Sequence, residues 1–367
     1  MRIPVSRSTA AKPFGLIALV PLLLAGTLAL SPPTSAAVSP GSWVKDTVHS
    51  LDIFSPDAAS EYYFNGYGTE DGARTIIRGE VPQSRYWSFT IYPSKAHVHD
   101  TEVHTDHGRF TLTIASSCHG VNGTCLASSS SDPSGIVLMR VYVPVDLNGA
   151  GTGGVPLPSI TWVSPKGTAL SLTEASGSSA VAFGLAVYRR EAGTLPASIT
   201  RTYPPAVPVP TPVTLPAPKI SEGGSGAFAN PDNDYQRVHM SMTRGNLIVS
   251  AEAPTYATDS FAHLNNLNRP ASKSPDVRYW SLCVDFVGNY TGACLRDEQI
   301  HVTADHRFTV VVAPACPVAG YVNCIPSGPV PLARALLYRT MLPTKSFHAH
   351  VFSGPYSLTA TYVARAG

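Results

Sequence analysis

Long apolar runs are scarce in this sequence of 367 residues. The one extended apolar stretch covers residues 16–30, follows three basic residues, and is too short and too badly flanked to span a membrane. Small residues around Ala36 suit cleavage by a signal peptidase. We therefore expect residues 1–37 to be an export signal and the mature chain to be secreted, with no transmembrane segment.

Charge is also scarce, because only 14% of the residues are Asp, Glu, Lys or Arg. Residues 1–37 contain three basic residues and no acidic one, so their removal changes the balance from 26 basic against 24 acidic residues to 23 against 24, a net charge of −1. This balance gives no electrostatic reason to expect nucleic acid or an anionic membrane as partner. The roughly 330 residues that remain are enough for two domains with cores of their own.

Familiar catalytic motifs are missing. The chain has no Gly-x-Ser-x-Gly, no His-Glu-x-x-His and no Cys-x-x-Cys. Glycines in residues 149–154 match a dinucleotide-binding fingerprint in form, but Val155 and Pro156 follow instead of a helix, which excludes the phosphate-cradling geometry. We expect no cofactor, with a divalent metal ion as the alternative.

What the sequence does contain is an internal repeat, from about 62–163 and again from about 230–364. Four landmarks recur in the same order: 85–88 and 278–281, 106–111 and 305–309, Cys118 with Cys125 and Cys316 with Cys324, and 140–144 and 339–343. A proline-rich segment lies between the two repeats and favours an extended polyproline conformation.

The repeats read as strands, because large apolar residues alternate with smaller polar ones after Arg85 and again after Arg278. We interpret Trp87 and Trp280 as core residues. The predicted fold is all-β, with two tandem antiparallel β-sandwich (jelly-roll-like) domains joined by the proline-rich linker. The expected boundaries are a signal peptide at 1–37, a first sandwich at 38–200 with a short helix at 179–190, a linker at 201–219, and a second sandwich at 220–367.

The six cysteines all lie in the part of the chain that we expect to be exported, which favours disulfides. Six cysteines allow fifteen pairings. The repeat reduces the number of plausible pairings, because two closely spaced cysteine pairs occupy equivalent places in the two repeats. The two remaining cysteines then form the third pair. The predicted disulfides are Cys118–Cys125, Cys316–Cys324 and Cys283–Cys294, and the alternative is buried free thiols.

The order of these strands is familiar. The Arg-Tyr-Trp-Ser strand at 85–88, the Asp-His-Gly-Arg-Phe-Thr segment at 106–111, the Arg-Val-Tyr-Val-Pro strand at 140–144 and the Val-Pro-Leu-Pro segment at 155–158 resemble the uncharacterised DUF1214-type domain. The second half is similar to secreted actinobacterial proteins of unknown function, through residues 230–235 and 278–283. The resemblance implies a fold and assigns no catalytic residue.

Histidines and carboxylates concentrate in residues 97–107. On a strand, His97 and His99 would share one face, and Glu102, His104 and Asp106 the other. Imidazole and carboxylate ligands suit zinc or another divalent transition metal. The candidate metal ligands are His97, His99, Glu102, His104, Asp106 and His107. The alternative is a solvated polar edge strand, which is a common defence against unwanted strand pairing.

The repeated arginines and tyrosines have two interpretations. Guanidinium groups can bind carboxylates or other anions, and tyrosines can line a ligand surface. Alternatively, each arginine pairs with an acid or a carbonyl inside its own sandwich. The candidate ligand-binding residues are Arg85, Tyr86, Arg278, Tyr279, Arg140 and Arg339. Side-chain oxygens in residues 230–234 could attract a hard cation, but turn capping explains them better.

These observations predict a secreted, disulfide-stabilised binding or cell-envelope-associated protein without catalysis. Its expected partner is an extracellular or envelope ligand, such as a glycan, a lipid or a polymer. One alternative is a metal-dependent hydrolase or lyase that uses residues 97–107. The other is a purely structural envelope protein.

Overall fold

The structure is a computed structural model that describes residues 43–46, 56–170, 219–222, 228–256, 275–286, 291–328 and 333–363. The predicted export signal at 1–37, the predicted helix at 179–190 and all of the predicted linker except Lys219 lie outside the described residues. Below, the first half means residues 43–170 and the second half means residues 219–363.

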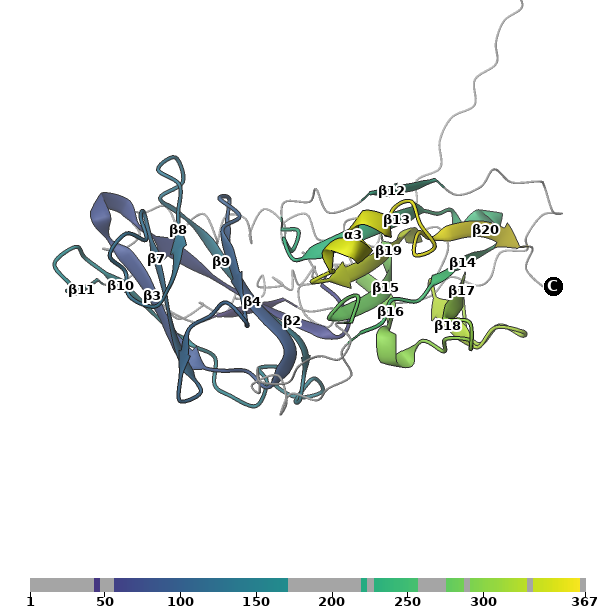
Figure 1. The fold of residues 1–367 in the computed structure, drawn as a ribbon, viewed down its shortest axis with the longest axis horizontal. Coiled ribbons are helices and arrows are strands. Elements are labelled where there is room, and N and C mark those ends of the chain that lie inside the picture. The colour runs from purple at the N-terminus through teal and green to yellow at the C-terminus, as the bar shows by residue number, and fades with distance from the viewer. Residues whose placement is uncertain are drawn as a thin grey trace, which may run out of the picture. The chain divides into compact units, whose positions relative to one another are not determined.

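The first half forms two mainly antiparallel sheets (Figure 1). Sheet 1 contains, in spatial order, β1 (Val44–Asp46), β2 (Ser60–Gly68), β9 (Ser134–Pro144), β4 (Ser84–Tyr92) and β5 (His97–His99). Sheet 2 contains β11 (Ala169–Leu170), β10 (Ser159–Val163), β3 (Arg74–Glu80), β7 (Arg109–Ala115) and β6 (Thr105–Asp106), with β8 (Thr124–Ala127) parallel to β7.

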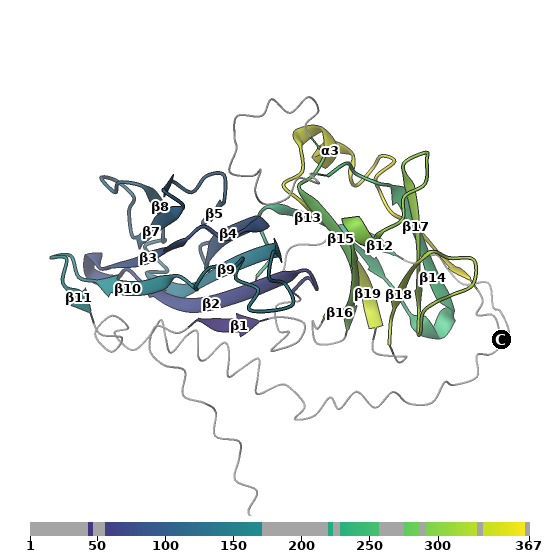
Figure 2. The same cartoon turned by 90° about the horizontal axis from the view of Figure 1, so that it is seen from below.

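In the second half, sheet 3 repeats the strand order of sheet 1, and sheet 4 repeats four of the six strands of sheet 2 (Figure 2). Sheet 3 contains β12 (Ile220–Glu222), β13 (Asn233–His239), β19 (Ala333–Met341), β15 (Tyr279–Phe286) and β16 (Thr291–Arg296). Sheet 4 contains β18 (Asn323–Pro326), β17 (Arg307–Ala313), β14 (Asn246–Glu252) and β20 (Thr359–Val363), with β18 again parallel to its neighbour. The α-helix in the described residues, α3 (Lys345–His350), begins after Thr344, whose side chain accepts a hydrogen bond from the Phe347 amide.

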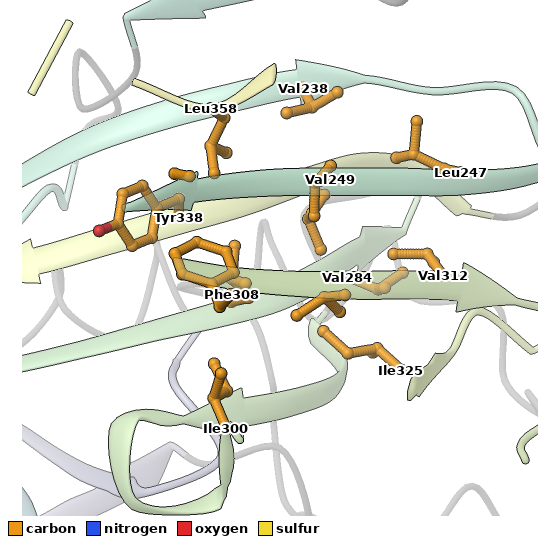
Figure 3. Packing of buried hydrophobic residues seen from close by; sticks show 14 of the residues in the cluster. Val238, Leu247, Val249, Val284, Ile300, Phe308, Val312, Ile325, Tyr338 and Leu358 are labelled. Atoms are coloured by element: carbon orange, nitrogen blue, oxygen red, sulfur yellow. The ribbon is translucent and has the colours of Figure 1, made fainter. Parts of the chain in front are cut away.

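Each half has a sandwich-like core between its two sheets. In the first half Trp87 packs on Phe110 with ring centroids 5.1 Å apart, and in the second half Trp280 packs on Phe308 at the same separation. Figure 3 shows the second core, where Phe308 and its apolar neighbours from several strands gather. The prediction that both tryptophans are core residues is confirmed, because they are 2% and 0% exposed.

Sheet 1 is buried on both faces. All nine residues of β4 are buried, although its odd and even positions point to opposite sides. One side faces the core shared with sheet 2, and the other contributes Tyr86 and Tyr92 to a cluster that also contains Tyr279 and Met341 of sheet 3. Residues 39–367 accordingly form one compact unit by their contacts.

The predicted disulfides are confirmed. Cys118 is bonded to Cys125, Cys283 to Cys294 and Cys316 to Cys324, so no described cysteine is free. The first and third clip equivalent loops, between β7 and β8 and between β17 and β18. Among the described residues, no helix is long and apolar enough to cross a membrane.

Candidate functional site

Arg85 and Arg278 make reciprocal ion pairs between the two halves. Arg85 Nη1 lies 2.6 Å from Asp297 Oδ2, and Nη2 contacts Glu298. Arg278 Nη1 lies 2.6 Å from Asp100 Oδ2. Asp297 directly follows β16 and Asp100 directly follows β5, so the two acids occupy equivalent places. Each arginine therefore pairs with an acid of the other half, which corrects the expectation of a partner inside its own sandwich.

Tyr86 and Tyr279 make reciprocal hydrogen bonds between the halves, as the two arginines make reciprocal ion pairs. The Tyr86 hydroxyl donates to Asp232 Oδ2 over 2.5 Å, and the Tyr279 hydroxyl donates to Asp57 Oδ1 over 2.8 Å. Both tyrosines are fully buried. Burial, together with the adjacent carboxylate, raises the pKa of each phenol well above its ordinary value. Both side chains are thus neutral hydrogen-bond donors to an acid of the opposite half.

Arg140 and Arg339 lie at the centre of the same region. Arg140 donates to Thr90 Oγ1, to the Tyr92 hydroxyl and to the Phe228 carbonyl, over 2.7–2.9 Å. Arg339 Nη1 lies 3.6 Å from Asp57 Oδ2. Burial acts to lower the pKa of Arg140, but the surrounding tyrosines outweigh this effect and raise it, so the guanidinium stays charged.

The structure therefore brings the six predicted ligand-binding residues into one region, which we call the Arg–Tyr cluster: Arg85, Tyr86, Arg140, Arg278, Tyr279 and Arg339. Their side chains contact other protein groups and, except for Arg278 at 16% exposure, are at most 4% exposed. A buried ion pair is expensive to break, because the remaining charge is left without a partner. The chemistry that this arrangement supports is the attachment of sheet 1 to sheet 3.

The first part of the histidine-rich segment borders this cluster. His97 Nε2 lies 3.3 Å from Asp232 Oδ1, and this hydrogen bond raises the pKa of His97. His99 lies 3.6 Å from Asp100 and 3.5 Å from Glu102. Burial acts to lower the pKa of His99, but the neighbouring carboxylates outweigh it and raise that pKa.

His104, Asp106 and His107 lie around β6 and the turn that joins it to β7. His107 Nδ1 lies 2.6 Å from Asp106 Oδ1, and both side chains are more than 80% exposed. His104 is anchored by its backbone, whose N–H donates to Thr124 Oγ1 over 2.8 Å. The six predicted metal ligands are thus divided between two places.

Among the described residues, one group of metal-ligating atoms is closely spaced, and it consists of Asp57 with Cys283 and Cys294. Both sulfurs belong to a disulfide and offer no thiolate, and the Asp57 carboxylate already accepts hydrogen bonds. The residues of that group fit a structural role better than a metal centre.

An open cavity of about 640 Å³ lies beside the β6–β7 turn. This volume is within the range of pockets for small ligands. Its lining combines cationic, acidic and neutral hydrogen-bonding groups: His104, Asp106, His107, Arg109, Phe110, Thr111, Asn122 and Gly123. We call it the β6–β7 cavity. Three of the predicted metal ligands line it, whereas the Arg–Tyr cluster does not.

Sequence reasoning missed the acids that complete the Arg–Tyr cluster, above all Asp57 and Asp232. A signal was present, because a Pro-Asp pair precedes the first long strand of each repeat, at 56–57 and at 231–232. The expected turn capping in 230–234 is seen, since the Asp232 N–H donates to Asn230 Oδ1 over 3.2 Å. The same Asp232 also reaches Tyr86, which no local pattern predicts.

Comparisons with known proteins bear on the fold. No protein-family model matches the chain. No curated protein matches it either. Among solved structures, the chain is similar to an uncharacterised protein from Burkholderia cenocepacia, with a TM-score of 0.53 and 10% identity over 90% of this chain and 84% of that one. A Vibrio parahaemolyticus protein matches with a TM-score of 0.43 and 11% identity over 84% and 90% of the two chains, too weakly to carry an argument.

The sheets and disulfides define the chain as a disulfide-bonded, all-β protein with sandwich-like antiparallel sheets. At 10% identity, the Burkholderia protein supports this fold and says nothing about activity.

Proposed function

We propose that this protein is a secreted, disulfide-stabilised binding or cell-envelope-associated protein without catalysis, built from two tandem β-sandwich domains. The observation that supports this proposal is the burial of the Arg–Tyr cluster, whose side chains are occupied in joining the halves. The DUF1214-type resemblance and the export suggested by residues 1–37 belong to the same proposal.

The binding surface in this proposal is the β6–β7 cavity. Its polar side chains face solvent, and Arg109 is 77% exposed, with Glu80 as a distant partner at 3.9 Å. Exposed guanidinium, amide and hydroxyl groups suit a ligand rich in hydroxyls and anionic groups. Among the expected partners, a glycan or an acidic envelope polymer therefore fits better than a lipid.

The test is binding of the purified protein to isolated envelope polysaccharide, measured by calorimetry or co-sedimentation. Arg109→Ala is expected to weaken binding about tenfold or more, because it removes a charge-assisted contact. Arg307→Ala is the matched control, since Arg307 is the exposed residue that begins β17 as Arg109 begins β7. Unchanged binding by Arg109→Ala would argue against the cavity, and no binding to any envelope fraction would argue against the proposal.

A metal-dependent hydrolase or lyase is the second candidate, because His104, Asp106 and His107 line the same cavity. Elemental analysis of untagged protein separates the two functions. A metal centre predicts near-stoichiometric metal that is lost in His104→Ala and kept in His301→Ala, its counterpart before β17, whose N–H donates to Asn323. Folded, metal-free protein with unchanged stability in chelator would remove this candidate.

A further inference from the structure

Arg140 and Arg339 occupy equivalent positions in the two halves. Arg140 lies opposite Ser88 on the neighbouring strand, and Arg339 lies opposite Ser281. Residues directly opposite each other in antiparallel strands project from the same face of the sheet. Each arginine therefore has a serine beside it on the face that is buried between sheets 1 and 3.

The two serine–arginine pairs differ in their surroundings. In the second half, Asp57 Oδ2 accepts a hydrogen bond from Ser281 Oγ and lies 3.6 Å from Arg339. In the first half, Ser88 Oγ and Arg140 Nε are fully buried, and neither atom has a described hydrogen-bond partner within 3.5 Å. The polar group that Ser88 affects is the Tyr86 hydroxyl, whose pKa burial raises and Ser88 acts to lower. Leaving buried donors unpaired costs stability, and more so on a charged group.

Chain spacing explains the difference. Asp57 lies three residues before β2, whereas Asp232 lies one residue before β13. Because β2 and β13 are equivalent strands, the two acids contact different residues of the opposite half. The Asp57 carboxylate contacts the serine–arginine pair of the second half, whereas the Asp232 carboxylate accepts a hydrogen bond from the Tyr86 hydroxyl of the first half. Within the described chain, Arg140 accordingly has hydrogen-bond acceptors but no carboxylate partner.

Neutral neighbours partly stabilise the positive charge of Arg140. The rings of Tyr62 and Tyr92 lie 5.2 and 5.9 Å from its guanidinium carbon, which is favourable for a cation. Neither ring supplies a full negative charge, and Arg140 Nε has no hydrogen-bond partner among the described groups. A hydroxyl and a charged N–H on the same buried face are both donors that a single anion can accept.

We propose that Ser88 Oγ and Arg140 Nε bind a small monovalent anion, represented by chloride, in the role that the Asp57 carboxylate has in the second half. Complete burial of both residues restricts the ligand to a small ion. This site is independent of the proposed ligand-binding function and of the β6–β7 cavity.

The first experiment measures thermal unfolding of the full chain in sodium chloride and in sodium gluconate at equal ionic strength. Because a ligand that binds the folded state stabilises it, chloride is expected to raise the Tm of the wild type by about 3 °C or more between 1 and 100 mM. Ser88→Ala removes one donor and is expected to lose most of this rise. Ser281→Ala is the matched control, because its serine is already paired with Asp57, and it is expected to keep the rise.

The second experiment does not depend on a variant. Crystals of the wild type soaked in bromide are expected to show an anomalous peak between Ser88 Oγ and Arg140 Nε. Equal Tm values in the two salts, the same chloride response in Ser88→Ala, or a water molecule without anomalous signal at that position would each overturn the anion site.

Discussion

At the scale of single residues, one carboxylate has a large effect. Asp57 is fully buried, accepts hydrogen bonds from Tyr279 and Ser281, and lies close to Arg339. Asp57→Ala leaves these donors without their acceptor, and we expect a loss of about 3–5 kcal/mol in the free energy of unfolding. Urea unfolding measures this loss. Asp106→Ala, which removes an exposed carboxylate, is the control and should unfold near the wild-type midpoint, so equal midpoints for the two variants would contradict the role of Asp57.

The contact between His97 and Asp232 predicts a pH dependence. The hydrogen bond to Asp232 raises the pKa of His97 above 6.5, so its stabilisation is fully present below pH 6.5 and is lost as pH rises through the folded pKa. Burial acts to raise the pKa of Asp232, but the hydrogen bonds from His97 and Tyr86 hold it below 3.8. That stabilisation is present above pH 3.8 and is lost as pH falls through the lowered value.

The pair should therefore contribute most between about pH 4 and 6.5. We expect His97→Gln to destabilise the protein more at pH 5.5 than at pH 8.5, as measured by urea unfolding at each pH. The raised pKa of His99 acts in both proteins and largely cancels in the difference. His119→Gln, an exposed histidine in the Cys118–Cys125 loop, is the control. A destabilisation by His97→Gln that is the same at both values would contradict this assignment.

At the scale of elements, the sequence predicted the strands and one of their two buried faces. Alternation identified Trp87 and Phe89 as core, and the repeat identified equivalent strands and the disulfides. Alternation of apolar residues with polar ones such as Ser88 is typical of a strand with one solvated face, yet all of β4 is buried. Alternation reports which residues share a face, but not what covers it. The cover comes from residues more than a hundred positions away, such as Asp232, whose own neighbourhood predicts only a turn.

The arginines that recur in both repeats also have a role that the sequence did not predict. Residues kept in both repeats suggested either ligand binding or contacts within each sandwich. The structure gives them a third role, because Arg85 and Arg278 each pair with an acid that follows the edge strand of the other half. A self-complementary contact requires the same residues on both sides, as in a symmetric dimer. Such a requirement would preserve these residues in both repeats without any ligand.

At the scale of the whole molecule, the contacts between the halves predict how the chain behaves when it is cut. A protease site introduced between residues 203 and 218 would cleave the proline-rich sequence and leave both sandwich-like cores intact. The two arginine pairs and the two tyrosine–aspartate hydrogen bonds remain after the cut, so we expect the fragments to stay together. Size-exclusion chromatography and sedimentation at micromolar concentration test this expectation.

The same cut protein measures the strength of the contact. In the double variant Arg85→Ala and Arg278→Ala, Asp297 and Asp100 lose their arginine partners in the other half, and we expect the fragments to dissociate at least about a hundredfold more readily. The matched control replaces Arg109 and Arg307, two exposed arginines in equivalent positions, and should leave the association unchanged. Fragments of the wild type that separate at micromolar concentration would show that the link between the halves depends on the connecting chain, and the Arg–Tyr cluster would then need another role.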